Sequence, residues 1–222
     1  MSTLAIILSD VHLGSRYCLI DEFLRFLESL PSGADLVLNG DIVDRWHHDI
    51  PEEHQLGLDA VRRESLKRHV VWVRGNHDDG YELKDPCKVE FADSYSIGHR
   101  LFASHGFDFD NVMPYHLTFI RLFRAMHNLR ISLGAEPVHV AHYAKKFSPL
   151  YNVLRRHVIM NAIEYGKENG YEVVTCGHTH YVEDDTKDGV RYINTGSWTE
   201  SPICYVQVER DAILLLEIEP SK

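Results

Sequence analysis

Residues 4–12 read LAIILSDVH, an apolar run that passes directly into a polar cluster. The run 4–8 predicts a buried strand, and residues 19–30 place their apolar side chains at helical spacing. The same order of strand and helix continues at 36–39, 52–68 and 70–74. This alternation predicts parallel strands joined by crossover helices, which is the signature of an α/β fold.

Beyond residue 75 the sequence predicts further strands and one long helical segment. Residues 107–169 lack strand-like alternation and contain helix-like stretches broken near three prolines. We expect a single domain over 1–222, long enough for one substantial core, with a helical insertion or lid at about 107–169. A hairpin turn is predicted at Asp188-Gly189, and strands are predicted at 89–97, 100–104, 172–176, 191–194, 203–208 and 212–218.

The composition excludes some classes of protein. A formal net charge of −10 argues against a stable nucleic-acid partner, because proteins that follow a phosphate backbone usually carry a basic surface. The four cysteines are far apart in the sequence and form no CxxC pair, so we expect free thiols in a reducing compartment. Neither a basic leader with a long apolar stretch nor a run of about 18 apolar residues is present, which predicts a cytoplasmic location.

Five short polar clusters follow strand-like runs. They read DVH at 10–12, GDIVD at 40–44, GNHD at 75–78, HG at 105–106 and GHTH at 177–180. A single cluster of this kind is typical of an ordinary turn. Ligands bind beyond the carboxyl ends of strands in open α/β sheets, so we expect the five clusters to converge on one crevice. Carboxylate, imidazole and amide oxygen together suit manganese, iron or zinc.

The spacing within two clusters suggests how their side chains are aimed. Asp10 and His12, like His178 and His180, are two residues apart, and an extended backbone would turn both members of a pair to one side. Glycines beside the clusters suit tight turns or a close backbone approach. This spacing is compatible with one metal ion or with two neighbouring ions.

In this order the five clusters resemble the calcineurin-like metallophosphoesterase family over residues 10–180. The resemblance implies a two-sheet β-sandwich flanked by helices and two divalent ions, manganese first, with iron or zinc as alternatives. It implies that Asp41 bridges the ions. One ion would bind Asp10, His12 and His180, and the other would bind Asn76, His105 and His178.

The resemblance also implies a hydrolytic reaction. A water between the metals would attack phosphorus, and His77 and Asp78 would lie beside the ligands as catalytic residues. His77 is the candidate proton donor to the leaving group. The alternative for His77 is a purely structural hydrogen bond to the metal site.

Later parts of the chain look most like the branch related to UDP-2,3-diacylglucosamine pyrophosphatase, an enzyme of lipid A biosynthesis. The likeness rests on Trp46 after the GDIVD cluster, on the insertion and on NTGSWTE at 194–200. Enzymes of that branch usually carry Arg where this chain has His77, and Asp where it has Phe107. The likeness implies a phosphorylated small molecule or lipid-linked nucleotide as substrate, with Trp46 and Asn194 as substrate contacts.

The insertion has its own charge. Residues 107–160 hold seven Lys or Arg against three Asp or Glu, opposite in sign to the whole chain. Arg121 and Arg124 are candidate contacts for an anionic headgroup. The interleaved apolar residues are candidates for an acyl groove or for peripheral contact with the inner face of a membrane. A helical hairpin with a solvated basic face explains the same pattern.

Two other classes share these features. A nucleotide phosphodiesterase or phosphatase of other specificity would use the same ligands. A non-catalytic scaffold of this fold would be expected to have lost ligands or His77, whereas the set here is complete.

Overall fold

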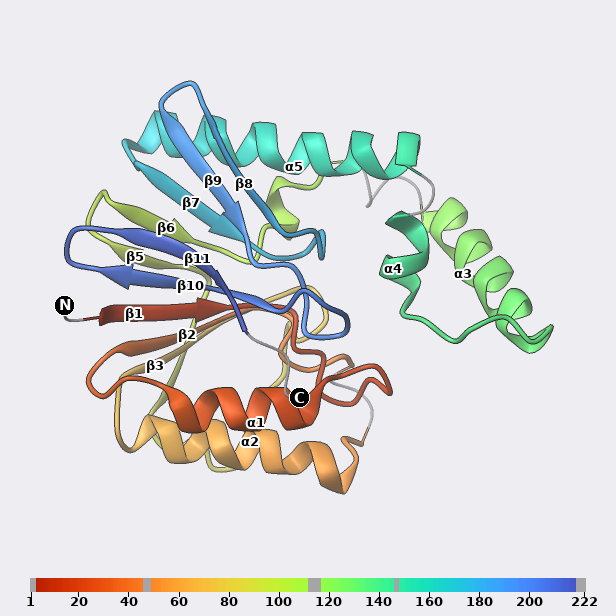
Figure 1. The fold of residues 1–222 in the computed structure, drawn as a ribbon, viewed down its shortest axis with the longest axis horizontal. Coiled ribbons are helices and arrows are strands. Elements are labelled where there is room, and N and C mark those ends of the chain that lie inside the picture. The colour runs from red at the N-terminus through yellow and green to blue at the C-terminus, as the bar shows by residue number, and fades with distance from the viewer. Residues whose placement is uncertain (1–2, 46–48, 112–116, 146–147, 219–222) are drawn as a thin grey trace.

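The computed structural model describes residues 3–45, 49–111, 117–145 and 148–218, without the side chains of 117–122, 124 and 148–150. Two sheets lie face to face, with helices on the outside (Figure 1). The first sheet has the order β11-β10-β1-β2-β3-β4 and the second has the order β5-β6-β7-β9-β8. The predicted α/β sandwich flanked by helices is therefore confirmed.

The amino-terminal half builds most of the first sheet. Parallel strands β1 (Thr3–Leu8), β2 (Asp35–Asn39) and β3 (Val70–Val73) are joined by α1 (Ile20–Ser29) and α2 (Glu52–Ser65). Ile6 and Leu8 pack toward α1 and α2, whereas Ala5 and Ile7 pack in the core shared with the second sheet. Burial on both faces explains why these strands are continuous apolar runs.

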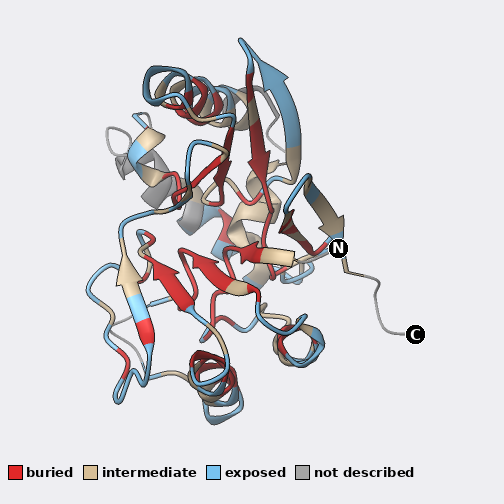
Figure 2. Ribbon diagram, turned by 90° about the vertical axis from the view of Figure 1, so that its left-hand side faces the viewer, coloured by how far each residue is buried: buried red, intermediate tan, exposed pale blue. Residues whose placement is uncertain are grey.

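The second sheet is formed later in the chain. Its strands are β5 (Tyr95–Ile97), β6 (Leu101–Ala103), β7 (Val173–Cys176), β8 (Glu183–Lys187) and β9 (Val190–Asn194). Strands β6, β7 and β9 run parallel to one another. The chain then returns to the first sheet through β10 (Cys204–Glu209) and β11 (Ile213–Glu217). Figure 2 shows the buried residues concentrated in the strands between the helices.

Two elements differ from the prediction. The single strand expected at 89–97 is two strands: β4 (Val89–Ala92) belongs to the first sheet and β5 to the second. The polar pair Asp93-Ser94, typical of turns, separates them. Strand β8 was missed because it is a mostly exposed edge strand of sequence EDDTK, which has no apolar alternation. The predicted turn at Asp188-Gly189 joins it to β9, and both turn residues have positive φ.

The 107–169 segment begins with a short 3-10 helix, η1 (Phe107–Phe109), and contains α3 (Leu117–Ser132), α4 (Val140–Lys145) and α5 (Ser148–Asn169). Ala162 and Ile163 of α5 are buried against the second sheet. Helices α3 and α4 stand beyond the strand ends in Figure 1. We refer to residues 117–145, which contain α3 and α4, as the lid.

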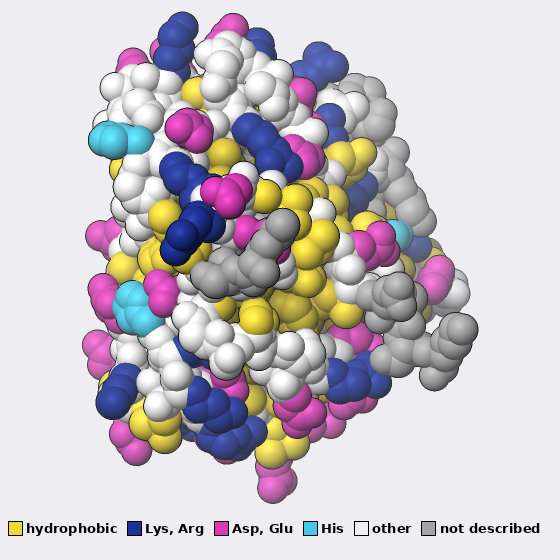
Figure 3. Space-filling view, turned by 60° about the vertical axis from the view of Figure 1, so that its left-hand side comes forward, with side chains coloured by type: hydrophobic (Ala, Val, Ile, Leu, Met, Phe, Trp, Pro, Cys, Tyr) yellow, Lys and Arg dark blue, Asp and Glu magenta, His cyan; other side chains and the backbone are white. Residues whose placement is uncertain are grey.

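The surface carries charges of both signs. Figure 3 shows Lys and Arg side chains interspersed with Asp and Glu on one face. The four cysteines are free. Within the described ranges, no helix is both long and apolar enough to cross a membrane.

Candidate metal centre

All seven predicted metal ligands lie in loops at the carboxyl ends of parallel strands. Asp10 and His12 follow β1, Asp41 follows β2 and Asn76 follows β3. From the second sheet, His105 follows β6, and His178 and His180 follow β7. Backbone hydrogen bonds tie neighbouring loops together, including Asp10 N to Gly40 O and His12 N to Asp41 O, both at 3.0 Å. The two sheets therefore present their polar loops at a common edge.

Most of these ligands share an unusual backbone conformation. Asp10, His12, Asp41, His178 and His180 have φ between 54° and 63°. This left-handed region is uncommon for residues other than glycine, and such residues cluster at functional sites. The expectation that an extended backbone aligns each i, i+2 pair is therefore wrong. The chain turns at each ligand, and the turns bring the paired side chains together.

The first group of ligands is compact and buried. His180 Nε2 lies 3.2 Å from Asp10 Oδ1 and 3.1 Å from His12 Nε2. His12 Nε2 is 3.8 Å from Asp10 Oδ1 and 3.9 Å from Asp41 Oδ2. One ligand atom from each of these four residues falls within 4.8 Å of all the others. A single cation could contact all four.

The second group adjoins the first through Asp41. Its Oδ2 atom is 3.2 Å from His105 Nε2 as well as 3.9 Å from His12 Nε2. Asn76 Oδ1 and His178 Nδ1 lie 3.0 Å apart, and the rings of His178 and His105 are 5.5 Å apart. Among the described residues, Asp41 is the carboxylate whose oxygen lies within 4 Å of an imidazole nitrogen from each group.

Hydrogen bonds away from the centre aim two imidazoles into it. The Nδ1 atom of His12 lies 3.1 Å from Asp44 Oδ1, and the Nδ1–H of His105 donates to the carbonyl of Asn39 at 3.0 Å. Each ring therefore directs Nε2 toward the carboxylates. Carboxylates and carbonyls in this position fix the tautomer of metal-binding histidines.

Several buried atoms of the centre have no hydrogen-bond partner. Among the described residues these include Asp10 Oδ1, His105 Nε2 and His180 Nδ1. Buried polar atoms are rarely left unpaired, so each one needs an explanation such as a bound ion. Oxygen and nitrogen donors without thiolate suit manganese, iron or zinc, and the residues present therefore fit divalent cations.

Glycine backbones press against both carboxylates. A Cβ atom at Gly177 would lie 2.1 Å from Asp10 Oδ2, and one at Gly75 would lie 2.3 Å from Asp41 Oδ1. No side chain fits at either position without moving a ligand. The glycines of two clusters are thus required by the close approach of the backbone to the ligands.

The carboxylates strongly perturb the histidines. Burial lowers the pKa of His12, but Asp10 and Asp44 outweigh it and raise that pKa to about 10. Burial likewise opposes charge on His105, yet Asp41 and Asp10 raise its pKa to about 9. When a chelator has removed the metal, both imidazoles are therefore expected to be protonated and positively charged at neutral pH.

We expect metal binding to displace those protons, because a ligating imidazole must be neutral. Metal affinity should rise with pH up to about 10, with about two protons released per chain at pH 7. A raised pKa stabilises the fold fully below the unfolded value of 6.5, so the stability of the metal-free protein should fall as pH rises from 6.5 to between 9 and 10. Calorimetry in buffers of different ionisation enthalpy would count the protons. A pH-independent affinity would contradict this charge state.

His77 lies at the edge of the centre. Its backbone N–H donates to Asp41 Oδ1 at 2.8 Å, and its Nδ1–H donates to the carbonyl of Asp44 at 2.6 Å. The side chain is 27% exposed and lines the cavity described below. Its Nε2 atom is thus the ring nitrogen left for a ligand.

Asp78 is placed differently from His77. It is buried and accepts hydrogen bonds from Gly75 N, Ile42 N and Trp72 Nε1 at 2.6 to 3.0 Å. It does not line the cavity. Its carboxylate connects the loop of Asp41 to the loop of Asn76, which is a positioning role.

The predicted substrate contacts separate into three cases. Trp46 lies outside the described residues. Arg121 and Arg124 belong to α3, but their side chains are not described. Asn194 is fully buried and donates to the carbonyl of Gly177 at 2.6 Å while accepting from Gly196 N at 2.9 Å. The structure therefore assigns Asn194 to holding the GHTH loop and leaves it no surface for a substrate.

Some residues of the site were not predicted. Asp44 is part of the GDIVD cluster but had been given no role. Asp110 is buried, and its Oδ2 atom lies 2.9 Å from His178 Nε2. Ser9 donates to Asp10 Oδ2 at 2.5 Å. Asp110 could have been predicted as a site residue because it is a carboxylate shortly after the HG cluster. The sequence around Ser9 has no feature that would have predicted its role.

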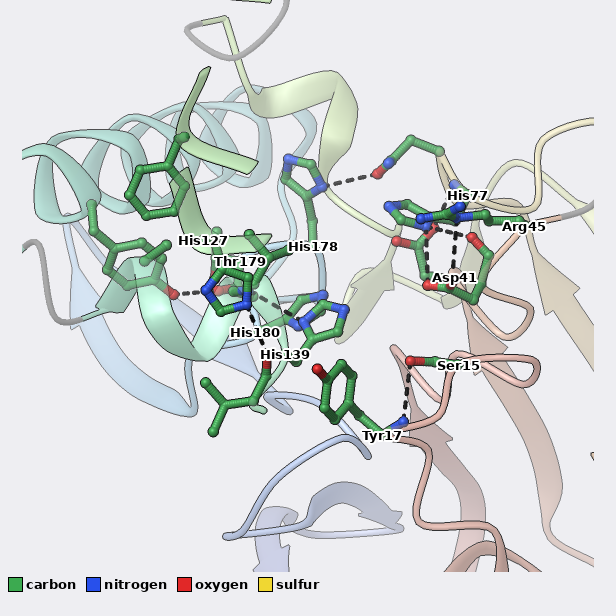
Figure 4. Close-up of a pocket in the computed structure, with 18 of the residues that line it drawn as sticks. Ser15, Tyr17, Asp41, Arg45, His77, His127, His139, His178, Thr179 and His180 are labelled. Atoms are coloured by element: carbon green, nitrogen blue, oxygen red, sulfur yellow. Dashed lines mark hydrogen bonds and ion pairs between the residues drawn. The ribbon is translucent and has the colours of Figure 1, made fainter. Parts of the chain in front are cut away.

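A cavity of about 1000 Å³ lies between the centre and the lid. Asp41, Asn76, His77, His178 and His180 line its polar end (Figure 4). Apolar side chains line much of the rest, among them Phe123, Ile131, Val138, Val140, Leu154 and Val158, and the charged residues Arg16, Arg45, Asp49 and Arg155 also contribute to the lining. The cavity therefore joins a group of metal-binding side chains to an apolar chamber.

Comparisons with known proteins identify related sequences and folds. The family model for calcineurin-like phosphoesterases matches residues 4–182. The chain is 26% identical over 238 residues to the DNA polymerase II small subunit of Methanothermobacter thermautotrophicus. That match covers 86% of the chain but 46% of the relative, so the chain spans about half the length of this curated relative.

Solved structures with similar folds are more distant. An archaeal phosphodiesterase is 14% identical with a TM-score of 0.48, covering 96% of this chain and 99% of that one. The phosphoesterase YfcE of E. coli is 16% identical with a TM-score of 0.47, covering 94% and 90%. A Vps29 variant of Entamoeba histolytica is 14% identical with a TM-score of 0.46, covering 98% and 99%. At TM-scores below 0.5 these likenesses carry no argument about activity.

Proposed function

The chain belongs to the calcineurin-like phosphoesterase family, and from this premise we propose that it hydrolyses phosphoester or pyrophosphate bonds with two divalent metal ions. The placement of Asp41 carries the proposal. Its carboxylate approaches histidines of two adjoining groups, His12 at 3.9 Å and His105 at 3.2 Å. We propose manganese as the metal, with iron and zinc as alternatives.

The ligands divide between two positions. Asp10, His12 and His180 would hold one ion, Asn76, His105 and His178 would hold the other, and Asp41 would contact both. Two divalent ions supply a nucleophile at neutral pH and offset the charge of a phosphoryl group. They also outweigh the two ligand carboxylates, which explains how an acidic chain would accept an anionic substrate.

We assign proton transfer to His77. The carbonyl of Asp44 accepts from Nδ1–H, so a ring protonated at both nitrogens would deliver the Nε2 proton to the leaving group and remain as the neutral Nδ1–H tautomer. Asp78 supports this arrangement indirectly, because it holds the turn that contains Gly75 and Asn76.

The cavity favours a substrate with two different ends. A phosphoryl group would sit at the polar end, and an apolar portion would occupy the chamber beneath α3, α4 and α5. A lipid-linked sugar nucleotide such as UDP-2,3-diacylglucosamine has this form, and we propose that substrate class. Met126 and Leu129 of α3 and Leu133 just after it are 44, 59 and 79% exposed at spacings of three and four, which supports peripheral contact with a membrane.

The test combines a substrate panel with one variant of the chamber. The metal-loaded protein should hydrolyse bis(p-nitrophenyl) phosphate, and chelation should abolish that activity. Leu154→Asn should raise the KM for UDP-2,3-diacylglucosamine about 10-fold, because burying a leucine contributes roughly 1.5 to 3 kcal/mol. The variant should leave the KM for the small diester unchanged.

One control variant and three contrary outcomes define the result. Met160→Asn changes an exposed residue of α5 outside the cavity and should alter neither KM. Equal effects of Leu154→Asn on both substrates would contradict the apolar chamber. If the protein hydrolyses unacylated nucleotides faster than UDP-2,3-diacylglucosamine, a nucleotide phosphodiesterase is favoured. If it hydrolyses no substrate of the panel, a non-catalytic scaffold is favoured.

A further inference from the structure

One side chain of the lid reaches the metal centre. His139 precedes α4, and its ring stacks on that of His180 with centroids 5.3 Å apart and an interplanar angle of 17°. The ring of His12 is 5.6 Å away. Figure 4 shows His139 and His180 next to each other at the polar end of the cavity. A residue from outside the five clusters thus lies over two predicted ligands.

Hydrogen bonding sets which nitrogen of His139 carries the proton. Nδ1 accepts from the backbone N–H of Ala141 at 3.3 Å, so the proton of the neutral ring belongs on Nε2. Within the described part of the chain no group accepts from Nε2. The imidazole lines the cavity. It therefore offers an N–H donor to whatever binds there.

The lid holds His139 from both sides. His127 Nε2–H donates to the carbonyl of Val138 at 3.0 Å, directly before the histidine. After it, Lys145 of α4 donates to Glu200 and to the carbonyl of His180, each at 2.5 Å. His142 of α4 also pairs with Glu200. These contacts fix the segment on the loops of the metal centre, so the donor is preorganised.

We propose that His139 donates its Nε2–H to an anionic oxygen of the phosphoryl group bound at the centre, as a ligand-binding residue supplied by the lid. This inference rests on the proposed function. A role as a further metal ligand fits less well, because the group of ligand atoms within 4.8 Å of one another consists of Asp10, His12, Asp41 and His180 and does not include His139.

Orthovanadate binding to the metal-loaded protein tests the proposal without turnover. Calorimetry should show His139→Ala binding orthovanadate about 10-fold more weakly, the usual effect of losing a hydrogen bond to a charged group. His139→Gln places an amide N–H near the position of Nε2 and should stay within about 3-fold of the parent. Metal content should be unchanged in both variants.

His157→Ala removes an exposed histidine of α5 outside the cavity and should bind orthovanadate like the parent. Unchanged binding by His139→Ala would overturn the inference alone. Loss of a metal ion from that variant, or a Gln variant as weak as the Ala variant, would overturn the donor role. A metal-loaded parent chain that binds no orthovanadate would overturn the proposed function together with the inference.

Discussion

An Asp41→Asn variant is expected to lose at least one metal ion and to lower turnover by roughly 10³-fold or more. The amide keeps the shape of the carboxylate, and its oxygen can still accept the 2.8 Å hydrogen bond from His77 N. It lacks the charge needed to bridge two cations. Each bound ion contributes several kcal/mol to stabilising the transition state, and every 1.36 kcal/mol is a factor of ten in rate.

The measurement is metal content by elemental analysis alongside kcat for bis(p-nitrophenyl) phosphate. Asp79→Asn provides the matched control, because Asp79 is an exposed carboxylate close by in the chain. The control should keep both ions and full activity. An Asp41→Asn protein with two ions and parental turnover would refute the assignment of the bridge.

The second large effect concerns His77. His77→Gln should retain both metal ions, because no proposed ligand is altered. Turnover should nevertheless fall on the order of 10² to 10⁴ for a substrate with a basic leaving group, the range for a positioned general acid. A p-nitrophenolate group leaves without a proton, so its release should depend much less on this residue.

Both substrates are measured with the same preparation of one variant, so differences in activity between protein preparations do not affect the comparison. His157→Gln, on an exposed part of α5, should behave as the parent. Equal losses on both substrates at full metal occupancy would mean that His77 positions the phosphoryl group. Loss of metal would mean that the ring of His77 supports the loop of Asp41.

The strand pattern explains why much of the fold was predictable. Strands such as β1 and β2 are buried on both faces and therefore read as apolar runs, and the ligand clusters follow them directly. By contrast, β8 has no apolar face, and the separation of β4 from β5 depends on which sheet each strand joins. Pairing between distant strands leaves no local signal in the sequence.

In the metal centre, too, the local sequence predicted some features, whereas others depend on contacts between distant segments. The seven predicted ligands are brought to one edge, but the left-handed backbone of five of them was not foreseen, because it depends on the packing of neighbouring loops. Asn194 was predicted as a substrate contact from the likeness to one enzyme branch, whereas the fold turns its amide into the GHTH loop. His139 could not be identified either, since its role depends on how the lid lies over the centre.

Electron paramagnetic resonance of the manganese-loaded chain reports whether Asp41 joins two metal ions. Two ions that share Asp41 should be close enough to couple magnetically, so we expect about two manganese ions per chain and a spin-coupled signal. A single bound ion, or two ions that give only uncoupled signals, would contradict a centre in which one carboxylate joins two metals.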